Sequence, residues 1–536
     1  MIEHTAQAPQ QVPSLIHPYI PQDKERSAAQ TLHTCMKRYF TLLMAAVMTL
    51  TILVTGCGSK NQETGPRTDL NVAMDCDADS LAPWDATLST TLITRTILFD
   101  PLCYYDAQTT TVSYYLAESY TESEDGLLYT FKLKDGVKFS DGSALTADDV
   151  VFTMEQYQAS YDNGSYFTCI DKTVAVDNLT VEFHLKHAYA PFMINMNNFY
   201  VASRAAFDAM GADAYAKAPV GCGQYTLENW KTAVQLDFAR NGQYYGTPAA
   251  LEKLSLIVYA DATARATALE AGDVDVASID VASVRNLESI DTIEIKEAPT
   301  TKSCLVAMNI SSDTFSDVKV RQAISCAIDK EYIVEATQRG YGTVSNEVYP
   351  ESVFGYSDQI KGYSYDVEKA KSLLAEAGIS TPCDMGTLTC NAGGAKVAEI
   401  VQQQLAQVGI NLSIQTLETA TFYDGVFNGT YDIAIIRTGF EPDASSYDVM
   451  FTEEGLGNLN YSQYVNPEIQ SMLNEAMSTV DTEARAELYR QAMELAEQDA
   501  IYVPLYEYPD LWAQNIGLSG EYRLNSVIEF GRFSWN

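Results

Sequence analysis

Alternating apolar and polar positions predict a half-buried β-strand at residues 127–133. The apolar positions of this strand are Leu127, Tyr129, Phe131 and Leu133. Two Asp-Gly turn dipeptides follow at 135–136 and 141–142. Thr146 then has the place of a helix N-cap, with Asp149 three residues later as its capping-box partner. The segment therefore predicts a strand, a turn and a helix in succession.

Helical spacing of apolar residues recurs further along the chain, at residues 318–328 and 367–377, and Gly378 is placed to end the second helix. A long amphipathic helix is predicted within 481–500, and strands are predicted at 69–74, 410–418 and 431–439. Helices that alternate with strands, without a fixed repeat, predict α/β lobes.

One long apolar run, from about Tyr39 to Val54, stands apart from these patterns. Lys37 and Arg38 precede it and Cys57 follows it, which is the tripartite pattern of an export signal. The run is shorter than the ~20 apolar residues of a membrane span. The stretch "LVTGC" resembles a bacterial lipobox, in which the cysteine becomes the lipidated first residue. The alternatives are a buried helix and a plain membrane anchor.

The lipobox interpretation divides the N-terminal region into three parts. Residues 1–35 are rich in Pro and Gln, lack periodicity and are interpreted as a non-native, disordered extension ahead of a translation start at Met36. Residues 36–56 would be the signal peptide, and residues 57–69 a flexible tether that keeps a folded domain at the membrane.

Composition narrows the function. The chain of 536 residues is longer than one hydrophobic core usually organises. The net charge of −37, without basic clusters, argues against nucleic-acid binding. Of five histidines, only His184 and His187 follow the apolar run, and ten cysteines include no CxxC pair, so we expect no metal site and no cofactor. The state of the eight cysteines other than Cys57 and the one before Met36 remains open. No nucleophile elbow or phosphate loop is present, so we expect no catalytic residues, although motif absence alone does not exclude a hydrolase.

Several ordered blocks resemble one family, the extracytoplasmic solute-binding proteins of ABC importers, family 5, the peptide- and nickel-binding type. The blocks are "LAESYTESEDGLLYTFKLKDGVKFSDGSALTADDVVF", "APVGCGQYTLENW", "RNGQYYG", "ALEAGDVDVA", "VKVRQAISCAIDKEYI" and "YDVEKAKSLLAEAG". The resemblance runs from about Asp69 to Tyr508. Cys222 and Gln224 depart from the usual Thr and Pro at positions that look structural.

The resemblance implies a two-lobed periplasmic-binding-protein-like α/β fold, type II, of the large-ligand class, with a hinge between the lobes. It places residues 70–309 and 505–536 in lobe 1 and residues 310–504 in lobe 2. A monomer would trap a small ligand between the lobes without bond chemistry and present it to permease and ATPase subunits. The expected location is the outer face of the cytoplasmic membrane, through a lipid anchor, or the periplasm.

The resemblance also directs attention to "YDIAIIRTGFEPDASSYDVMF", where the family's strand end and loop face the ligand. Asp443 is the first match to the acidic residue that holds a peptide N-terminus, and Glu441 is the second. Arg437 with Thr438 resembles a motif of nickel-binding members, and an Arg fork suits a carboxylate. The alternatives are structural roles without ligand contact: Asp443 would cap a turn, and Arg437 would form an ion pair.

Two further candidates lie in the family's first cleft loop. Trp84 would either stack on a ligand or pack as core, and Arg95 would either meet a carboxylate or play a structural role. The sequence therefore favours capture of di- or oligopeptides for import. A chelated-nickel ligand is the second hypothesis, and peptide sensing without net transport is the third.

Overall fold

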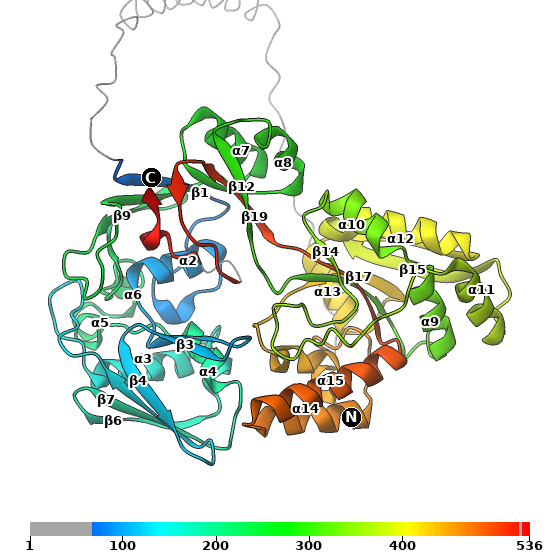
Figure 1. The fold of residues 1–536 in the computed structure, drawn as a ribbon, viewed down its shortest axis with the longest axis horizontal. Coiled ribbons are helices and arrows are strands. Elements are labelled where there is room, and N and C mark those ends of the chain that lie inside the picture. Colours follow the sequence, from blue (N-terminus) through cyan, green and yellow to red (C-terminus); the bar gives the residue numbers. More distant parts are fainter. Residues whose placement is uncertain (1–66, 525–527) are drawn as a thin grey trace, which may run out of the picture. The chain divides into compact units, whose positions relative to one another are not determined.

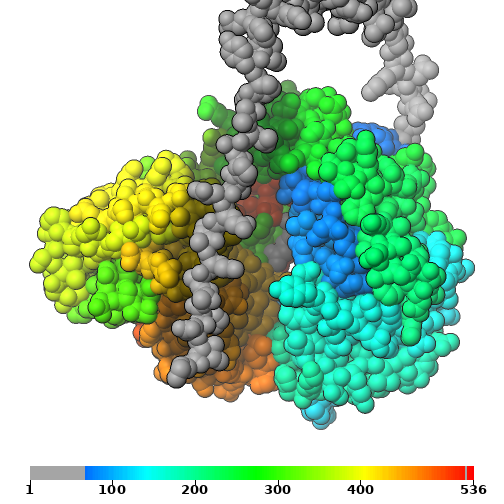
Figure 2. All heavy atoms as spheres, turned by 180° about the vertical axis from the view of Figure 1, so that it is seen from behind, coloured from blue at the N-terminus to red at the C-terminus, as the bar shows by residue number. Residues whose placement is uncertain are grey.

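The structure is a computed structural model, and it describes residues 67–524 and 528–536. The proposed extension, the signal peptide, Cys57 and all but the last three residues of the tether lie outside the described residues. Within the described ranges, no helix combines the length and apolarity needed to cross a bilayer. The described chain folds around two large sheets, each with its own helices (Figure 1) and its own hydrophobic core. In the space-filling view from behind, the blue-to-cyan residues and the yellow-to-orange residues gather on opposite sides (Figure 2).

Lobe 1, as the structure defines it, is built on a seven-stranded mixed sheet. In spatial order its strands are β12 (Ile293–Ala298), β19 (Asp510–Asn515), β11 (Val276–Ile279), β1 (Asp69–Met74), β10 (Lys253–Val258), β9 (Gln235–Arg240) and β8 (Tyr225–Lys231). β1 pairs in parallel with β10 and β11, and β19 pairs antiparallel with β11 and β12. A strand from the C-terminal part of the chain therefore completes a sheet that the N-terminal part begins.

A second, four-stranded antiparallel sheet extends lobe 1. Its order is β4 (Ala117–Glu122), β5 (Leu128–Leu133), β7 (Thr180–Leu185) and β6 (Ile170–Asp177). Two small hairpin-like pairs, β2 (Cys103–Asp106) with β3 (Thr111–Tyr114) and β20 (Leu518–Ser519) with β21 (Ser534–Trp535), complete its strands. The helices are α2 (Ser89–Leu98), α3 (Ala147–Ala159), α4 (Phe192–Asn195), α5 (Arg204–Met210), α6 (Ala212–Tyr215), α7 (Ala262–Ala271) and α8 (Val281–Leu287).

Lobe 2 is built on a six-stranded sheet. In spatial order its strands are β14 (Thr343–Val344), β18 (Tyr502–Glu507), β13 (Ser303–Met308), β17 (Ile433–Thr438), β15 (Cys383–Asn391) and β16 (Ile410–Leu417). Two apolar clusters pack with it, one containing alternate β13 residues such as Val306 and the other containing Leu305. The helices are α9 (Val318–Ala327), α10 (Lys330–Gln338), α11 (Val367–Glu376), α12 (Ala395–Gln407), α13 (Thr419–Phe427), α14 (Pro467–Ser478) and α15 (Thr482–Gln498).

The chain crosses between the lobes at residues 299–302 and again at 508–509. The strands that flank the two crossings are paired on both sides, because β12 lies beside β19 in lobe 1 and β13 lies beside β18 in lobe 2. The two crossing segments therefore run side by side, and Tyr508 N donates to Lys302 O at 3.2 Å. β13 and β18 both belong to lobe 2, which corrects the boundaries at 309/310 and 504/505 that the sequence suggested.

The local sequence patterns are confirmed. Tyr129, Phe131 and Leu133 point into the core from β5, while Leu127 is only half-buried. Thr146 and Asp149 form a capping box at the start of α3. Just beyond the predicted end of α11, Gly378 has φ +74°, the left-handed conformation in which glycine is favoured.

Candidate functional site

A large cavity, here called the main cavity, lies between the lobes and has a volume of about 970 Å³. Helix α2 and Tyr166 line it from lobe 1, and α13, the end of β17 and the following loop line it from lobe 2. The crossing residues Lys302 and Tyr508 also line it, together with Asp510 at the start of β19. This volume lies within the range typical of small-molecule sites.

Arg437 is the strongest anion-binding candidate in the main cavity. It sits near the end of β17, and its guanidinium carbon lies 4.4 Å from the centre of the Tyr508 ring. In the described part of the chain its Nε has no hydrogen-bond partner, and its Nη1 has a long contact of 3.5 Å to Gly393 O. No carboxylate among the described residues forms an ion pair with Arg437. A half-buried guanidinium without an acid partner is a ready site for a ligand carboxylate.

Glu441 lies where the main cavity meets a second cavity of about 280 Å³, here called the side chamber. Its Oε1 accepts a hydrogen bond of 2.7 Å from the hydroxyl of Tyr166, a contact between lobe 2 and lobe 1. Burial and the nearby Glu441 charge raise the pKa of Tyr166, so the phenol remains a donor. The other carboxylate oxygen of Glu441 remains available to a cation in the cavity.

Asp443, two residues further, has a different environment. It is 3% exposed and forms a two-point ion pair with Arg485 of α15, with contacts of 2.6 and 2.8 Å. Its Oδ1 also accepts from Ser445 N at 3.0 Å. The pair borders a third interlobe cavity of about 270 Å³, the distal cavity. Because Arg485 already neutralises Asp443, the geometry makes Glu441 the better candidate for a ligand ammonium, which reverses the order expected from sequence.

Arg95 lines the side chamber from α2 and is 5% exposed. Its Nη2 donates to Asn198 Oδ1 at 3.2 Å, and its guanidinium carbon lies 4.7 Å from the centre of the Tyr200 ring. The structure thus brings Arg95 and Glu441 to one chamber and Arg437 and Glu441 to the main cavity.

Trp84 packs in the lobe 1 core instead of lining the main cavity or the side chamber. Its ring is stacked on Tyr215, with centroids 5.9 Å apart, and makes edge contacts with Phe152 and Phe207. Only 7% of the residue is exposed. Of the two alternatives for Trp84, the geometry favours core packing.

The aromatic lining of the main cavity was not predicted from the sequence. Tyr166, Tyr423, Tyr461 and Tyr508 come from four separate segments, and nothing in their local sequence sets them apart from the protein's many core tyrosines. The sequence has 34 tyrosines and only 19 phenylalanines. This excess indicates a tyrosine-lined binding site but does not say which tyrosines form it.

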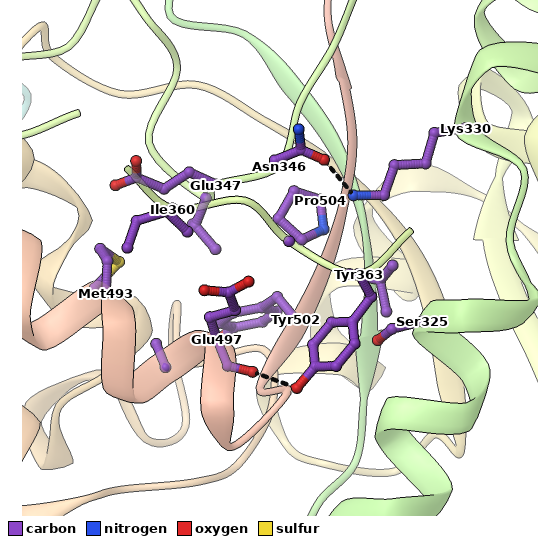
Figure 3. A pocket seen from close by; sticks show the side chains of 14 residues that line it. Ser325, Lys330, Asn346, Glu347, Ile360, Tyr363, Met493, Glu497, Tyr502 and Pro504 are labelled. Atoms are coloured by element: carbon purple, nitrogen blue, oxygen red, sulfur yellow. Dashed lines mark hydrogen bonds between the residues drawn. The ribbon is translucent and has the colours of Figure 1, made fainter. Parts of the chain in front are cut away.

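A further pocket lies inside lobe 2, away from the cleft, and holds only about 30 Å³ (Figure 3). Lys330 donates there to Ser345 O at 3.0 Å, and burial lowers its pKa to about 8. Burial raises the pKa of Glu347 to about 8. The space suits ordered water but not a peptide, so these groups are assigned to the lobe 2 framework.

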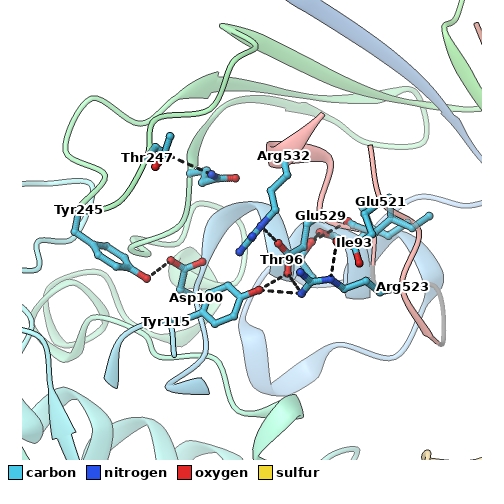
Figure 4. Close-up of polar contacts among 12 residues, drawn as sticks. Ile93, Thr96, Asp100, Tyr115, Tyr245, Thr247, Glu521, Arg523, Glu529 and Arg532 are labelled. Carbon is cyan, nitrogen blue, oxygen red and sulfur yellow. Dashed lines mark hydrogen bonds and ion pairs between the residues drawn. The ribbon is translucent and has the colours of Figure 1, made fainter. Parts of the chain in front are cut away.

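The C-terminal segment fixes the wall of lobe 1 beside the side chamber (Figure 4). Glu529 accepts from Tyr115 at 2.6 Å and pairs with Arg523 at 2.7 Å and with Arg532. Thr96 of α2, which lines the chamber, donates to Ile528 O at 3.2 Å. This network connects the end of the chain to the helix that carries Arg95.

The eight cysteines within the described residues are all free thiols. In the same ranges, no group of three or more His, Cys, Asp or Glu side chains is arranged to hold a metal ion. His184 lies in β7, and its Nε2 is 2.9 Å from a carboxylate oxygen of Glu182.

Several known binding proteins are similar to this chain in sequence. The chain is 28% identical to heme-binding protein A of Haemophilus influenzae, covering 76% of this chain and 81% of that protein. It is 28% identical to the dipeptide-binding protein of Escherichia coli, covering 75% and 82%. A glutathione-binding protein of Pectobacterium atrosepticum is 29% identical, with coverage of 86% and 92%.

Solved structures share the fold. The ABC transporter substrate-binding protein CtaP of Listeria monocytogenes superimposes with a TM-score of 0.81 at 24% identity, covering 88% of this chain and all of that chain. DppA of Helicobacter pylori, solved with the peptide STSA, has a TM-score of 0.71 at 25% identity, covering 88% and 98%. Both support the two-lobed architecture described above.

Residues 111–457 match the family described as bacterial extracellular solute-binding proteins, family 5. The expected family and two-lobed fold are therefore confirmed. Family 5 proteins bind small ligands on the extracytoplasmic side and deliver them to an ABC permease, and they are not enzymes. This chain belongs to the family 5 extracellular solute-binding proteins of ABC transport systems.

Proposed function

We propose that this protein captures short peptides between its lobes and delivers them to a membrane permease for import. The observation that carries the proposal is the pairing of opposite charges around one large cavity. Arg437 offers an anion site without an acid partner, and Glu441 offers a carboxylate whose contact is a neutral tyrosine hydroxyl. A peptide with free termini carries the two complementary charges.

The walls of the main cavity suit a peptide of varied sequence. Tyrosine rings provide flat apolar surface together with hydroxyl groups that can hydrogen-bond to a backbone. Because the contacts come from both lobes, a ligand gains affinity when the lobes approach, and its binding shifts the population toward the closed form. The relatives whose names give dipeptides and glutathione as ligands agree with a peptide-sized guest.

The same proposal includes an anchor. Lipidation at Cys57 would keep the two lobes at the outer face of the cytoplasmic membrane, close to the permease, through the tether that ends at residue 69. The test is metabolic labelling with a palmitate analogue, with Cys57→Ser as the control. Labelling that persists in Cys57→Ser would overturn the anchor.

Calorimetry of protein unfolded, stripped of ligand and refolded tests the ligand class. We expect tri- and tetrapeptides with free termini to bind with micromolar or tighter affinity, and Arg437→Met to lose roughly tenfold or more because one charged hydrogen bond is lost. Arg437→Lys should recover only part of the affinity, since it restores the charge but not the planar fork.

Two other hypotheses are tested by calorimetry with nickel and by an uptake assay. A heat signal with nickel that requires histidine, and none with peptides, would replace peptides by chelated nickel, whose chelator carboxylates Arg437 would meet. Peptide binding without uptake of labelled peptide by cells would favour sensing over import.

A further inference from the structure

The side chamber opens beside Glu441 and is lined almost wholly by lobe 1. It shares Leu92, Tyr166 and Glu441 with the main cavity. The proposed function requires that the ammonium of the peptide sits at Glu441. The side chain of the peptide's first residue then lies within reach of the chamber. The chamber volume of about 280 Å³ has room for one side chain of moderate size.

The chamber has a positively charged group without a counter-ion. No carboxylate among the described residues pairs with Arg95. Its contacts there include the ring of Tyr200, the neutral side chain and carbonyl of Asn198 and the hydroxyl of Tyr157. Arg95 Nε and Asn198 Nδ2 are buried and find no acceptor within residues 67–524 and 528–536. Two unsatisfied donors on neighbouring side chains indicate that an acceptor is missing.

Two asparagine side chains of the chamber are already engaged. Asn197 exchanges hydrogen bonds with the backbone of Tyr105 at 2.7 and 2.9 Å, and Asn163 donates to Trp84 O at 2.7 Å. The chamber's other acid besides Glu441 is Asp162, which is exposed, so water screens its charge. Arg95 is buried, so its charge acts across a medium of lower dielectric.

We propose that the side chamber holds the side chain of the ligand's first residue and that Arg95 selects an acidic one. Glu441 would take the ammonium while Arg95 and Asn198 take the carboxylate of the same residue. The inference rests on the proposed peptide function and adds the substrate class: peptides that begin with Glu or Asp.

The chamber is held in shape independently of a ligand. Thr96 is tied to Ile528 O, and the guanidinium carbon of Arg523 lies 5.6 Å from the ring centre of Tyr104, another wall residue. A preformed pocket orders few groups on binding and therefore discriminates between ligands by their contacts.

The test compares Glu-Ala-Ala, Gln-Ala-Ala and Ala-Ala-Ala by calorimetry on wild type, Arg95→Met and Arg204→Met, whose arginine is exposed on α5 and serves as the matched control. We expect wild type and Arg204→Met to bind Glu-Ala-Ala about tenfold or more tighter than Gln-Ala-Ala, because the amide cannot form a charged contact. In Arg95→Met the two peptides should bind equally.

The outcomes separate the two proposals. Equal binding of the Glu and Gln peptides by wild type would overturn the acidic preference and leave peptide binding intact. A preference that persists in folded Arg95→Met would overturn the assignment to Arg95. No binding of any peptide would overturn the proposed function and this inference with it. If Arg95→Met does not fold, Arg95→Lys and the wild-type comparison still decide the preference.

Discussion

Glu441 and Asp443 provide a direct test of which carboxylate meets the ligand. Asp443 is 3% exposed and Arg485 is 6% exposed, and two short contacts join them. Replacing one partner leaves the other charge buried and unpaired, at a cost of about 3–5 kcal/mol. Asp443→Asn should therefore lower the free energy of unfolding by that amount, which corresponds to a Tm lower by roughly 6–20 °C.

Glu441→Gln should leave stability nearly unchanged and should weaken peptide binding. The side chain is half-buried and accepts a hydrogen bond from the hydroxyl of Tyr166. An amide oxygen can accept the same bond, so stability should change by less than about 1 kcal/mol. The lost charge should weaken the hold on a peptide ammonium by about 1.5–3 kcal/mol, or roughly 10- to 150-fold in Kd.

The assays are thermal unfolding without ligand and calorimetry with a tripeptide and its N-acetylated form. The acetylated peptide lacks the ammonium, so Glu441→Gln should bind it about as well as wild type does. The reasoning would be refuted if Asp443→Asn kept the wild-type Tm and lost peptide binding, because Asp443 would then be the ligand's carboxylate.

Three other perturbations test the assignments. Trp84→Ala should cost about 3–5 kcal/mol of stability because it empties an aromatic core position, and loss of affinity at unchanged stability would instead place Trp84 at the ligand. Gly221→Ala should lower the free energy of unfolding by about 1–3 kcal/mol, measured by urea denaturation, because its Cβ would overlap the carbonyl oxygen of Leu98; an unchanged urea midpoint would contradict this packing. Burial raises the pKa of Asp100 from its ordinary value of 3.8 to about 7, so folding favours its protonated form and stability should fall as pH rises between those values, by at most about 4 kcal/mol. Asp100→Asn should remove this part of the decline, and urea midpoints at about pH 5 and about pH 8 that fall equally in both proteins would contradict the assignment.

The sequence predicted those features that depend on neighbouring residues. The capping box at Thr146 and the glycine after α11 are set within one turn of helix, and both appear as expected. The different roles that we infer for the carboxylates of Glu441 and Asp443 were not predictable in this way. Their roles depend on Arg485, which lies 42 residues beyond Asp443 on another helix. Arg95 and Arg437 have no acid partner among the residues that the structure describes, and this too depends on long-range packing that no local pattern records.

The lobe boundaries show a similar limit. Residues 303–308 form an apolar strand that either sheet could have accommodated by pattern alone. Its pairing with β17 and β18 decides its membership, and strand pairing across more than a hundred residues is not readable from periodicity.

The two adjacent crossings also determine where a guest can enter and leave. Sliding or twisting one lobe against the other would break the contacts between the crossings, including Thr300 with Tyr508 at 2.7 Å and Lys302 with Asp510 at 2.6 Å, whereas bending preserves them. Bending separates the lobes most at the edge farthest from residues 299–302 and 508–509. A peptide too long for the enclosed space would thus project at that edge, and a label placed on its free end should report from there.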